Sequence, residues 1–550
     1  MLQRFTLLAL VCLTVGSLSA QVRYLDPIFE VSEPTRMQYG ANVDVFLQGV
    51  NNLDLDVYQP EGDTDSLRPV AVVFPTGNFL LQYLNQGPYG SLRDSAVVEI
   101  LSRLTARGYV GMAAEYRTGW LPQSQNQDVR TSTLLQAAYR GGQDAHTLAR
   151  FLRKTVVEQG NPMRIDTSRI VYLGLGTGGY VVLTHAYLDE VEEVLDDDRF
   201  YQNVNGTLIP YVNEANFSNP QGTLPATFPT SQGGGPSNIP NHVEYNSDVA
   251  MSVNFNGACG DLDWMTGDDN DPITLGYHAP SDPFAPFSVG AVVVPTTGDV
   301  VITGVAGTEA VVEKANMLGL NDAIADANMV PLAPQFGQLA TVVNATNNQY
   351  KQIDIDLTLL GQGSSVDLSH DNMFPLSVND RRSSSGAIGS TYNWIDSTRV
   401  RAEITAFNSA FMQNVDASAV IRNEVRTNPN AYDGAAARVV IDTIMAHFLP
   451  RAYMGLNLDA LVSTQDLLTP EQVAFAVTPN PASEYVLVET AVDQPIRDWA
   501  IYDMNGRRVR QGFGVNNYQA YVTRGDLPRG AYVLRIRVDK GISAKKIIFE

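Results

Sequence analysis

The stretch Ile170-Val-Tyr-Leu-Gly-Leu-Gly-Thr-Gly-Gly-Tyr180 decides the fold of this chain. It opens with a short apolar, β-branched run, which is typical of a buried strand, and then enters a cluster of glycines that permits a sharp turn. A helical pattern leaves the cluster, carried by Val181, Val182, Leu183, His185, Ala186 and Leu188. The stretch therefore predicts a strand, a tight turn and a helix in direct succession.

Strand, sharp turn and helix form the setting of the G-x-S-x-G nucleophile elbow, in which a strained turn presents a serine. On that pattern the segment is Gly174-Leu-Gly-Thr-Gly178, with Gly176 at the nucleophile position. Glycine has no side chain with which to attack a substrate. A shift of one residue would put Thr177 at the apex, with Leu175 where the first glycine belongs. Both alternatives stay open in the sequence.

Strands and helices alternate on both sides of this stretch. Apolar patterns predict strands at 53–57, 69–74, 109–116, 251–255 and 273–277, and helices around 97–101 and 134–153. This rhythm indicates crossover connections and a mainly parallel, doubly wound sheet of the α/β class.

Two long stretches interrupt the rhythm. Residues 189–247 begin acidic and become rich in Asn, Pro, Gly and Ser, which predicts an insertion that forms a lid over an active-site mouth. Residues from about 330 to 430 are irregular as well. After them, 435–449 predict a final amphipathic helix that ends at Pro450.

The composition limits the partners. The 550 residues carry a net charge of -22, which argues against nucleic acid and anionic membrane surfaces. The acidic residues between Asp261 and Asp271 miss the spacing of a calcium loop, and the glycine cluster lacks the Lys-Ser/Thr of a phosphate-binding loop. We therefore expect no metal and no cofactor.

The N-terminus has the features of a secretory signal peptide. A positive start at Met1-Leu-Gln-Arg4 precedes a short apolar core and a small-residue end at Ala20, so residues 1–20 are the predicted signal. No later stretch reaches about 18 apolar residues, and we expect no transmembrane segment in the mature chain. One cysteine, Cys259, remains after cleavage and is predicted to be a small buried apolar residue.

From about Phe475 the chain changes character. Short alternating strands at 485–489, 499–502 and 532–537, with turn signals between them, predict a separate β-sandwich joined by a linker at 461–474. Residues 475–550 resemble the type A sorting domain of the Bacteroidetes type IX secretion system. The matching pieces are Pro479-Asn-Pro-Ala-Ser483, Ile501-Tyr-Asp-Met-Asn-Gly-Arg507, Leu527-Pro-Arg-Gly-Ala-Tyr-Val533 and Lys545-Lys-Ile-Ile-Phe549. The resemblance implies recognition by the translocon and a location outside the cell or on its surface.

Residues from about 40 to 455 resemble the carboxylesterase/lipase branch of the α/β-hydrolase fold. The matching segments outside the elbow are Gly108-Tyr-Val110, Glu115-Tyr-Arg117, Tyr139-Arg140, Gln143-Asp-Ala145, Arg150-Phe-Leu-Arg153, Gly257-Ala-Cys-Gly-Asp261 and Gly276-Tyr-His-Ala-Pro-Ser-Asp-Pro283. The resemblance implies an α/β-hydrolase domain over 21–460, with Asp282 as the triad acid.

The same resemblance indicates the other site residues. The base follows the acid in chain order, and His370, on a loop, fits that role better than His447, on the final helix. The oxyanion region falls at Gly77 and Asn78, with Thr177 from the elbow. Esterases of this branch carry His-Gly-Gly there, whereas this chain has Pro75-Thr-Gly-Asn-Phe79.

Three functions remain open. Loss of a serine nucleophile can cost about 10⁶ in kcat, so the first is a pseudo-esterase that binds a small ester-like or hydrophobic ligand, or a partner, in the old cleft. The second is an active ester hydrolase that uses Thr177 or a water activated by His370. The third is a structural cell-surface protein for which the fold is only a scaffold.

Overall fold

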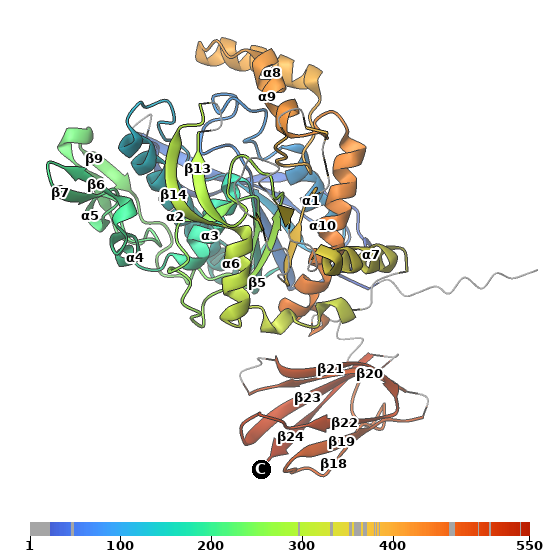
Figure 1. Ribbon diagram of the computed structural model, residues 1–550. Coiled ribbons are helices and arrows are strands. Elements are labelled where there is room, and N and C mark those ends of the chain that lie inside the picture. The colour runs from blue at the N-terminus through green and yellow to red at the C-terminus, as the bar shows by residue number, and fades with distance from the viewer. Residues whose placement is uncertain are drawn as a thin grey trace, which may run out of the picture.

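The structure is a computed structural model of the chain (Figure 1). It describes residues 22–45, 49–294, 297–330, 334–350, 355–356, 365–366, 371–378, 380, 382–383, 386–460, 468–492, 494–504, 508–538 and 541–550. The predicted signal peptide, the first half of the predicted linker at 461–474 and the candidate base His370 lie outside these residues.

The centre of the molecule is an eight-stranded sheet with the order β1-β2-β4-β3-β5-β10-β12-β17. Its strands are β1 (Thr35–Val43), β2 (Val50–Tyr58), β3 (Arg68–Phe74), β4 (Val110–Ala114), β5 (Ile165–Leu175), β10 (Met251–Phe255), β12 (Ile273–His278) and β17 (Met373–Pro375). β2 pairs antiparallel with both of its neighbours, and the strands from β4 to β17 are parallel. The predicted α/β class with a mainly parallel sheet is confirmed.

Helices cover both faces of this sheet. α1 (Ser95–Thr105) and α10 (Gly434–Gly455) lie on one face, and α2 (Gln127–Gln159) and α3 (Thr177–Tyr187) lie on the other, as Figure 1 shows. The buried strand β3 contributes side chains to the hydrophobic cores on both faces of the sheet, because alternate side chains of a strand point to opposite faces. Ala71 and Val73 belong to the core with α1 and α10, whereas Val70 and Val72 belong to the core with α2.

The final helix differs from its prediction. α10 passes through Pro450 and ends at Gly455. A proline inside a helix costs about 3 kcal/mol. The turn after it buries Ala452 and Met454 in the core, and burial of a large apolar side chain returns about 1.5–3 kcal/mol, so packing carries the helix past the proline.

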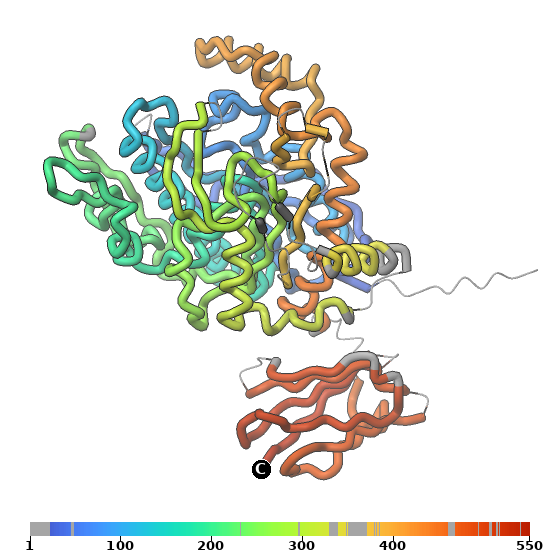
Figure 2. The backbone as a smooth tube through the Cα atoms, viewed as in Figure 1, coloured from blue at the N-terminus to red at the C-terminus, as the bar shows by residue number. Residues whose placement is uncertain are grey.

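The insertion at 189–247 folds into short elements at the edge of the molecule. They are α4 (Val191–Leu195), β6 (Tyr201–Val204), β7 (Thr207–Pro210), α5 (Glu214–Phe217), β8 (Ala226–Phe228) and β9 (Gly235–Asn238). Side chains of α2 anchor them, since Tyr139 Oη donates to the carbonyl of Ser218 at 2.7 Å and Gln143 Nε2 donates to that of Phe217 at 2.6 Å. Figure 2 shows this green segment at the side of the main body, away from the orange helices near residue 410.

Much of the stretch from 330 to 430 that the sequence left irregular is helical. It contains α7 (Pro334–Tyr350), α8 (Ser397–Phe411) and α9 (Ala417–Thr427). α8 and α9 form an antiparallel hairpin that extends from one end of the molecule (Figure 1). Between this region and the insertion lie α6 (Thr308–Met317) and a small sheet of β11 (Ala258–Cys259), β13 (Val289–Val293) and β14 (Val300–Gly307). Cys259 is fully buried there, as predicted.

The C-terminal residues form two antiparallel sheets. One contains β18 (Ala476–Thr478), β19 (Tyr485–Glu489) and β22 (Gln519–Thr523), and the other contains β20 (Ile496–Tyr502), β21 (Arg508–Asn517), β23 (Gly530–Val538) and β24 (Gly541–Phe549). Val488 from the first sheet and Ile501 and Leu534 from the second belong to one buried cluster. The two sheets therefore pack on a shared core as a β-sandwich.

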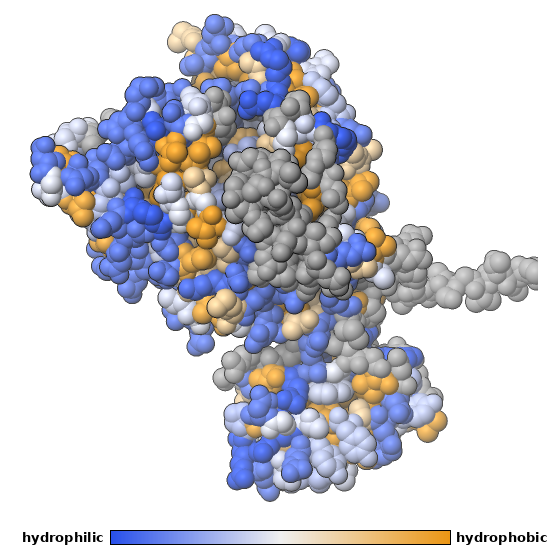
Figure 3. Space-filling model, viewed as in Figure 1, coloured by the Kyte–Doolittle hydropathy of each residue, from blue (hydrophilic) through white to orange (hydrophobic). Residues whose placement is uncertain are grey.

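On the face shown in Figure 3 hydrophilic side chains surround small apolar groups, in keeping with the net charge of -22. Within the described ranges, no helix is both long enough and apolar enough to cross a membrane.

Candidate functional site

The turn between β5 and α3 has the geometry that the glycine cluster predicts. Gly176 precedes the first helical residue, Thr177, with φ 53° and ψ -114°. Its N–H donates to the carbonyl of Phe255 at the end of β10, at 2.7 Å. Side chains other than glycine adopt this backbone conformation only with strain. Gly176, rather than Thr177, therefore occupies the apex of the elbow.

The flanking glycines are required by close backbone approach. A Cβ on Gly174 would lie 2.1 Å from the carbonyl oxygen of Gly178, and a Cβ on Gly178 would lie 2.2 Å from that of Phe74. The turn thus packs directly against the end of β3, with which β5 pairs in parallel.

The space in front of the apex is filled by Thr76, the second residue after β3. A Cβ built on Gly176 would lie 2.2 Å from Thr76 Oγ1 and 2.9 Å from Thr76 Cβ. Contacts this short do not occur between real side chains. The Thr76 side chain therefore stands where the side chain of an apex nucleophile would begin.

The hydroxyl of Thr177 has a structural partner. Thr177 Oγ1 lies 3.0 Å from Tyr116 Oη, and Tyr116 Oη lies 2.8 Å from the carbonyl oxygen of Pro75. The single proton of Tyr116 goes to that carbonyl, so Thr177 donates to Tyr116. This chain of hydrogen bonds ties the start of α3 to the segment after β3.

The predicted acid, Asp282, lies in the loop after β12 and is 5% exposed. Its Oδ1 accepts the N–H groups of Phe284 and Ala285, at 2.7 and 3.2 Å, and its Oδ2 accepts Asn256 Nδ2. Burial raises the pKa of Asp282 to about 7, against the opposing effect of these donors.

Asn256 follows β10 directly and holds an unusual position. It is 3% exposed, and within the described part of the chain its Oδ1 has no hydrogen-bond partner. The amide N–H that it gives to Asp282 fixes which end of the side chain faces away from the carboxylate.

The predicted oxyanion residues also lie at this edge of the sheet. Asn85 Nδ2 donates to the carbonyl of Gly77 at 3.2 Å, and Trp120 Nε1 donates to that of Asn78 at 2.6 Å. In the described ranges the backbone N–H groups of Gly77, Asn78 and Thr177 make no hydrogen bond, which leaves them available to a ligand oxygen.

The structure describes one of the two histidines that were considered as the base. His370 lies outside the described residues. His447 is fully buried on α10, where its Nδ1 lies 3.0 Å from Tyr277 Oη, so it packs in the core.

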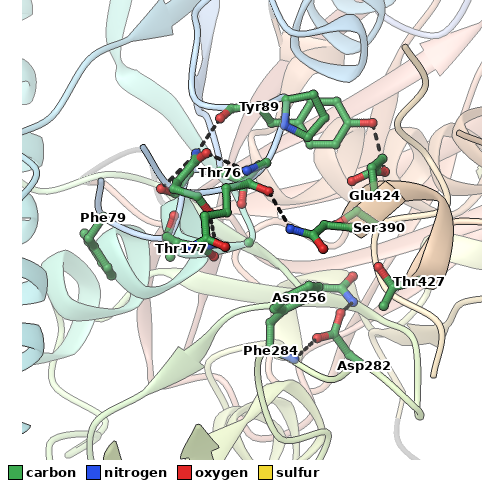
Figure 4. A pocket seen from close by; sticks show the side chains of 18 of the residues that line it. Thr76, Phe79, Tyr89, Thr177, Asn256, Asp282, Phe284, Ser390, Glu424 and Thr427 are labelled. Atoms are coloured by element: carbon green, nitrogen blue, oxygen red, sulfur yellow. Dashed lines mark hydrogen bonds between the residues drawn. The ribbon is translucent and has the colours of Figure 1, made fainter. Parts of the chain in front are cut away.

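The elbow, the oxyanion segment, Asn256 and Asp282 line one cavity of about 140 Å³, shown in Figure 4. Its wall has contributions from the carboxyl ends of three parallel strands, including Thr76 after β3, Gly176 after β5 and Asn256 after β10. Ligands of open α/β sheets bind at this edge of the strands. Aromatic side chains also line the cavity, namely Phe79, Tyr89, Trp120, Tyr180 and Phe284.

The end of α9 and the residues after it close one side of this cavity, and the lid at 189–247 stays a prediction. Asn423, Glu424 and Arg426 to Asn428 line the cavity, and no described residue of 189–247 does so. The insertion is held against α2 by the hydrogen bonds of Tyr139 and Gln143.

Glu424 is an ionisable residue in this wall that the sequence analysis does not single out. Its Oε1 accepts from Tyr89 Oη at 3.0 Å and from Asn428 Nδ2 at 2.7 Å. Burial raises the pKa of Glu424 to about 7. The cavity therefore holds two carboxyl groups, Asp282 and Glu424, that titrate near neutrality.

Comparisons with known proteins identify one part of the chain. Residues 476–550 match the family described as the secretion system C-terminal sorting domain, which confirms the predicted sorting domain. No curated protein matches the chain.

Solved structures with partial similarity include the thermophilic esterase Est2 of the planctomycete Thermogutta terrifontis. The native enzyme is 17% identical, with a TM-score of 0.24, and covers 46% of this chain and 73% of its own. Its form phosphorylated by paraoxon is 16% identical, with a TM-score of 0.25, and covers 46% of this chain and 74% of its own.

Proposed function

We propose that this chain is an exported pseudo-esterase: an α/β-hydrolase scaffold that has lost its nucleophile and binds a small ligand in the old active-site cavity. The observation that carries the proposal is the pair formed by Gly176 and Thr76. The apex residue has no side chain, and the volume in front of it is filled by a neighbouring one.

The scaffold assignment rests on the order of parts along the sheet. The antiparallel β2 precedes five parallel crossovers, the elbow follows β5, and an acidic residue follows β12, two strands further along the sheet. An α/β-hydrolase presents its nucleophile on a strand-to-helix turn and its acid later in the chain. In this proposal the α/β-hydrolase domain spans 21–460, a signal peptide precedes it, and the type IX sorting domain at 475–550 directs export to the cell surface or the medium.

A ligand-binding role agrees with what remains of the site. The N–H groups of Gly77, Asn78 and Thr177, which would receive an oxyanion, are still unpaired in the described chain. The aromatic walls are intact, and such concave, mostly apolar pockets with a few convergent polar groups are typical of small-molecule sites.

Hydrolysis of short p-nitrophenyl esters by the full chain tests this proposal. We expect the natural protein and its Thr177→Ala variant to show the same background rate, since the Thr177 hydroxyl is a donor to Tyr116 and has no catalytic role. Enzymatic turnover that Thr177→Ala abolishes would show an active hydrolase with a threonine nucleophile. Turnover that survives Thr177→Ala and disappears in His370→Ala would show a water-based hydrolase.

A further inference from the structure

The wall of the cavity includes side chains that accept hydrogen bonds. Asn256 Oδ1, the Asp282 carboxylate and the Glu424 carboxylate all line it. Figure 4 shows Asn256 beside Asp282 on one side of the cavity, with Glu424 and Tyr89 on another. Arg426, at the exposed end of α9, is the cationic residue among those described that line the cavity.

The unpaired acceptor is the decisive group. Asn256 is 3% exposed, and its Oδ1 has no partner among the described residues. A buried polar atom without a hydrogen-bond partner destabilises the protein, and a ligand that donates to it recovers that free energy. Tyr180 Oη, on the wall, is a second buried polar atom without a described partner.

The orientation of the Asn256 amide follows from its neighbour. An ionised carboxylate accepts only, so in its ionised form Asp282 requires the NH₂ end of Asn256 at Oδ2. The carbonyl end is then turned away from Asp282. A ligand must therefore bring a donor, not an acceptor, to this position.

The surrounding rings add a preference for positive charge. Phe79, Trp120, Tyr180 and Phe284 also line the cavity, and aromatic faces attract ammonium groups, most strongly where water is excluded. A neutral hydroxyl would satisfy Asn256 but would gain nothing from the two carboxylates or from the rings.

We propose that this cavity binds an organic ammonium ligand, a primary amine on a short apolar chain, whose charged end is received by Asn256 Oδ1 with the Asp282 and Glu424 carboxylates. This inference rests on the proposed binding function and specifies its ligand class. A cavity of about 140 Å³ has room for an amine of about five heavy atoms.

Calorimetric titration of the full chain with n-butylammonium, n-butanol and n-butyrate tests the proposal. We expect n-butylammonium to bind about tenfold or more tighter than n-butyrate, a difference that one charged hydrogen bond supports. Glu424→Gln keeps the acceptor for Tyr89 and Asn428 but removes the charge, and should weaken n-butylammonium about tenfold. Glu99→Gln is the matched control, because it removes one negative charge outside the cavity, on α1 beside Arg103 and Arg438. It should leave the affinity for n-butylammonium unchanged.

The Asp282→Asn variant gives the sharpest result. Its side-chain NH₂ can donate to Asn256 Oδ1, so the Asn256 amide turns over and presents its own NH₂ to the cavity. We expect the preference to reverse, with n-butyrate bound more tightly than n-butylammonium.

Two outcomes overturn the inference. They are equal or tighter binding of n-butyrate by the natural protein, and failure of all three probes to bind. Both outcomes can be told apart from failure of the proposed function, because that failure is detected as enzymatic turnover of esters. If Asp282→Asn does not fold, the comparison of Glu424→Gln with Glu99→Gln decides the question.

Discussion

Thr76 Oγ1 lies 2.2 Å from the point where a Cβ on Gly176 would stand. The two residues follow neighbouring parallel strands, β3 and β5, and meet because Phe74 pairs with Gly174 in the sheet. An apex serine and the present position of Thr76 therefore exclude one another. The Thr76 side chain occupies the space that a side chain at the apex would need.

Gly176→Ser should destabilise the protein in two ways. The backbone conformation at φ 53° costs a non-glycine residue about 1–3 kcal/mol. The overlap with Thr76 adds about 1–3 kcal/mol, as in other overpacked sites. Urea unfolding of the full chain measures the sum.

Thr76→Ala in the Gly176→Ser background should recover part of the overlap cost, because it removes the Oγ1 contact at 2.2 Å and leaves both the Cβ contact at 2.9 Å and the backbone cost. Gly62→Ser is the matched control, since Gly62 also has positive φ (74°) but nothing within 4 Å of its Cβ position. Strictly additive effects of the Thr76 and Gly176 substitutions would show that the two side chains do not compete for space.

The stability of the protein should depend on pH through Glu424. Its pKa is raised from 4.5 to about 7 in the folded state, so the folded state binds this proton more tightly than the unfolded state. The contribution to stability is present below about pH 4 and is lost as the pH rises from about 4 to about 7. The described groups at this carboxyl are Tyr89 and Asn428.

Glu424→Gln removes the ionisation and keeps both hydrogen bonds. We expect the variant to gain stability relative to the natural protein as the pH rises from 4 to 7, in urea unfolding at a series of pH values. A constant difference between the two proteins across that interval would exclude a raised pKa at Glu424.

A buried ion pair joins the segment after β4 to α2. Arg117 Nε lies 2.8 Å from Asp144 Oδ1, and Arg117 also donates to Gln143 Oε1 at 3.1 Å. Arg117→Met leaves the Asp144 charge buried without its partner and should cost about 3–5 kcal/mol in unfolding free energy. Arg399→Met, in the exposed i,i+4 pair with Glu403, should cost at most about 0.5 kcal/mol. Similar losses in the two variants would contradict this assignment.

Removal of residues 476–550 should prevent export. The family match assigns these residues to a secretion system sorting domain, and their strands share a core of their own. We expect the shortened chain to accumulate inside the outer membrane, as measured by immunoblots of cell fractions and medium. Undiminished release into the medium would contradict a sorting role.

The sequence predicts the central fold because its signals there are local. The alternation of apolar runs and helical spacing places strands at 251–255 and 273–277, where β10 and β12 lie. The hairpin of α8 and α9 was missed, since polar side chains cover most of both helices and only a narrow apolar stripe, including Ile404, Val420 and Ile421, is buried. The end of α10 was misplaced because tertiary packing outweighs the local effect of Pro450.

The candidate site is only partly visible in the sequence. The glycine spacing indicates the elbow, and Gly176 and Asp282 line the cavity where they were expected. Thr76, Asn256 and Glu424 belong to no sequence motif. Sheet register brings Thr76 and Asn256 together, and α9 adds Glu424, which lies 168 residues after Asn256 in the chain. The sequence gives one indication that Asn256 belongs to the site, which is its position directly after the buried strand β10.

The most direct test of the account is covalent labelling of the natural full chain with paraoxon, read by intact mass and peptide mapping. Organophosphates label an activated hydroxyl nucleophile, and the account places none at the elbow. It predicts no phosphoryl adduct on any residue lining the cavity in the natural protein. A stoichiometric adduct on Thr177 or Thr76 would contradict it and establish an active hydrolase.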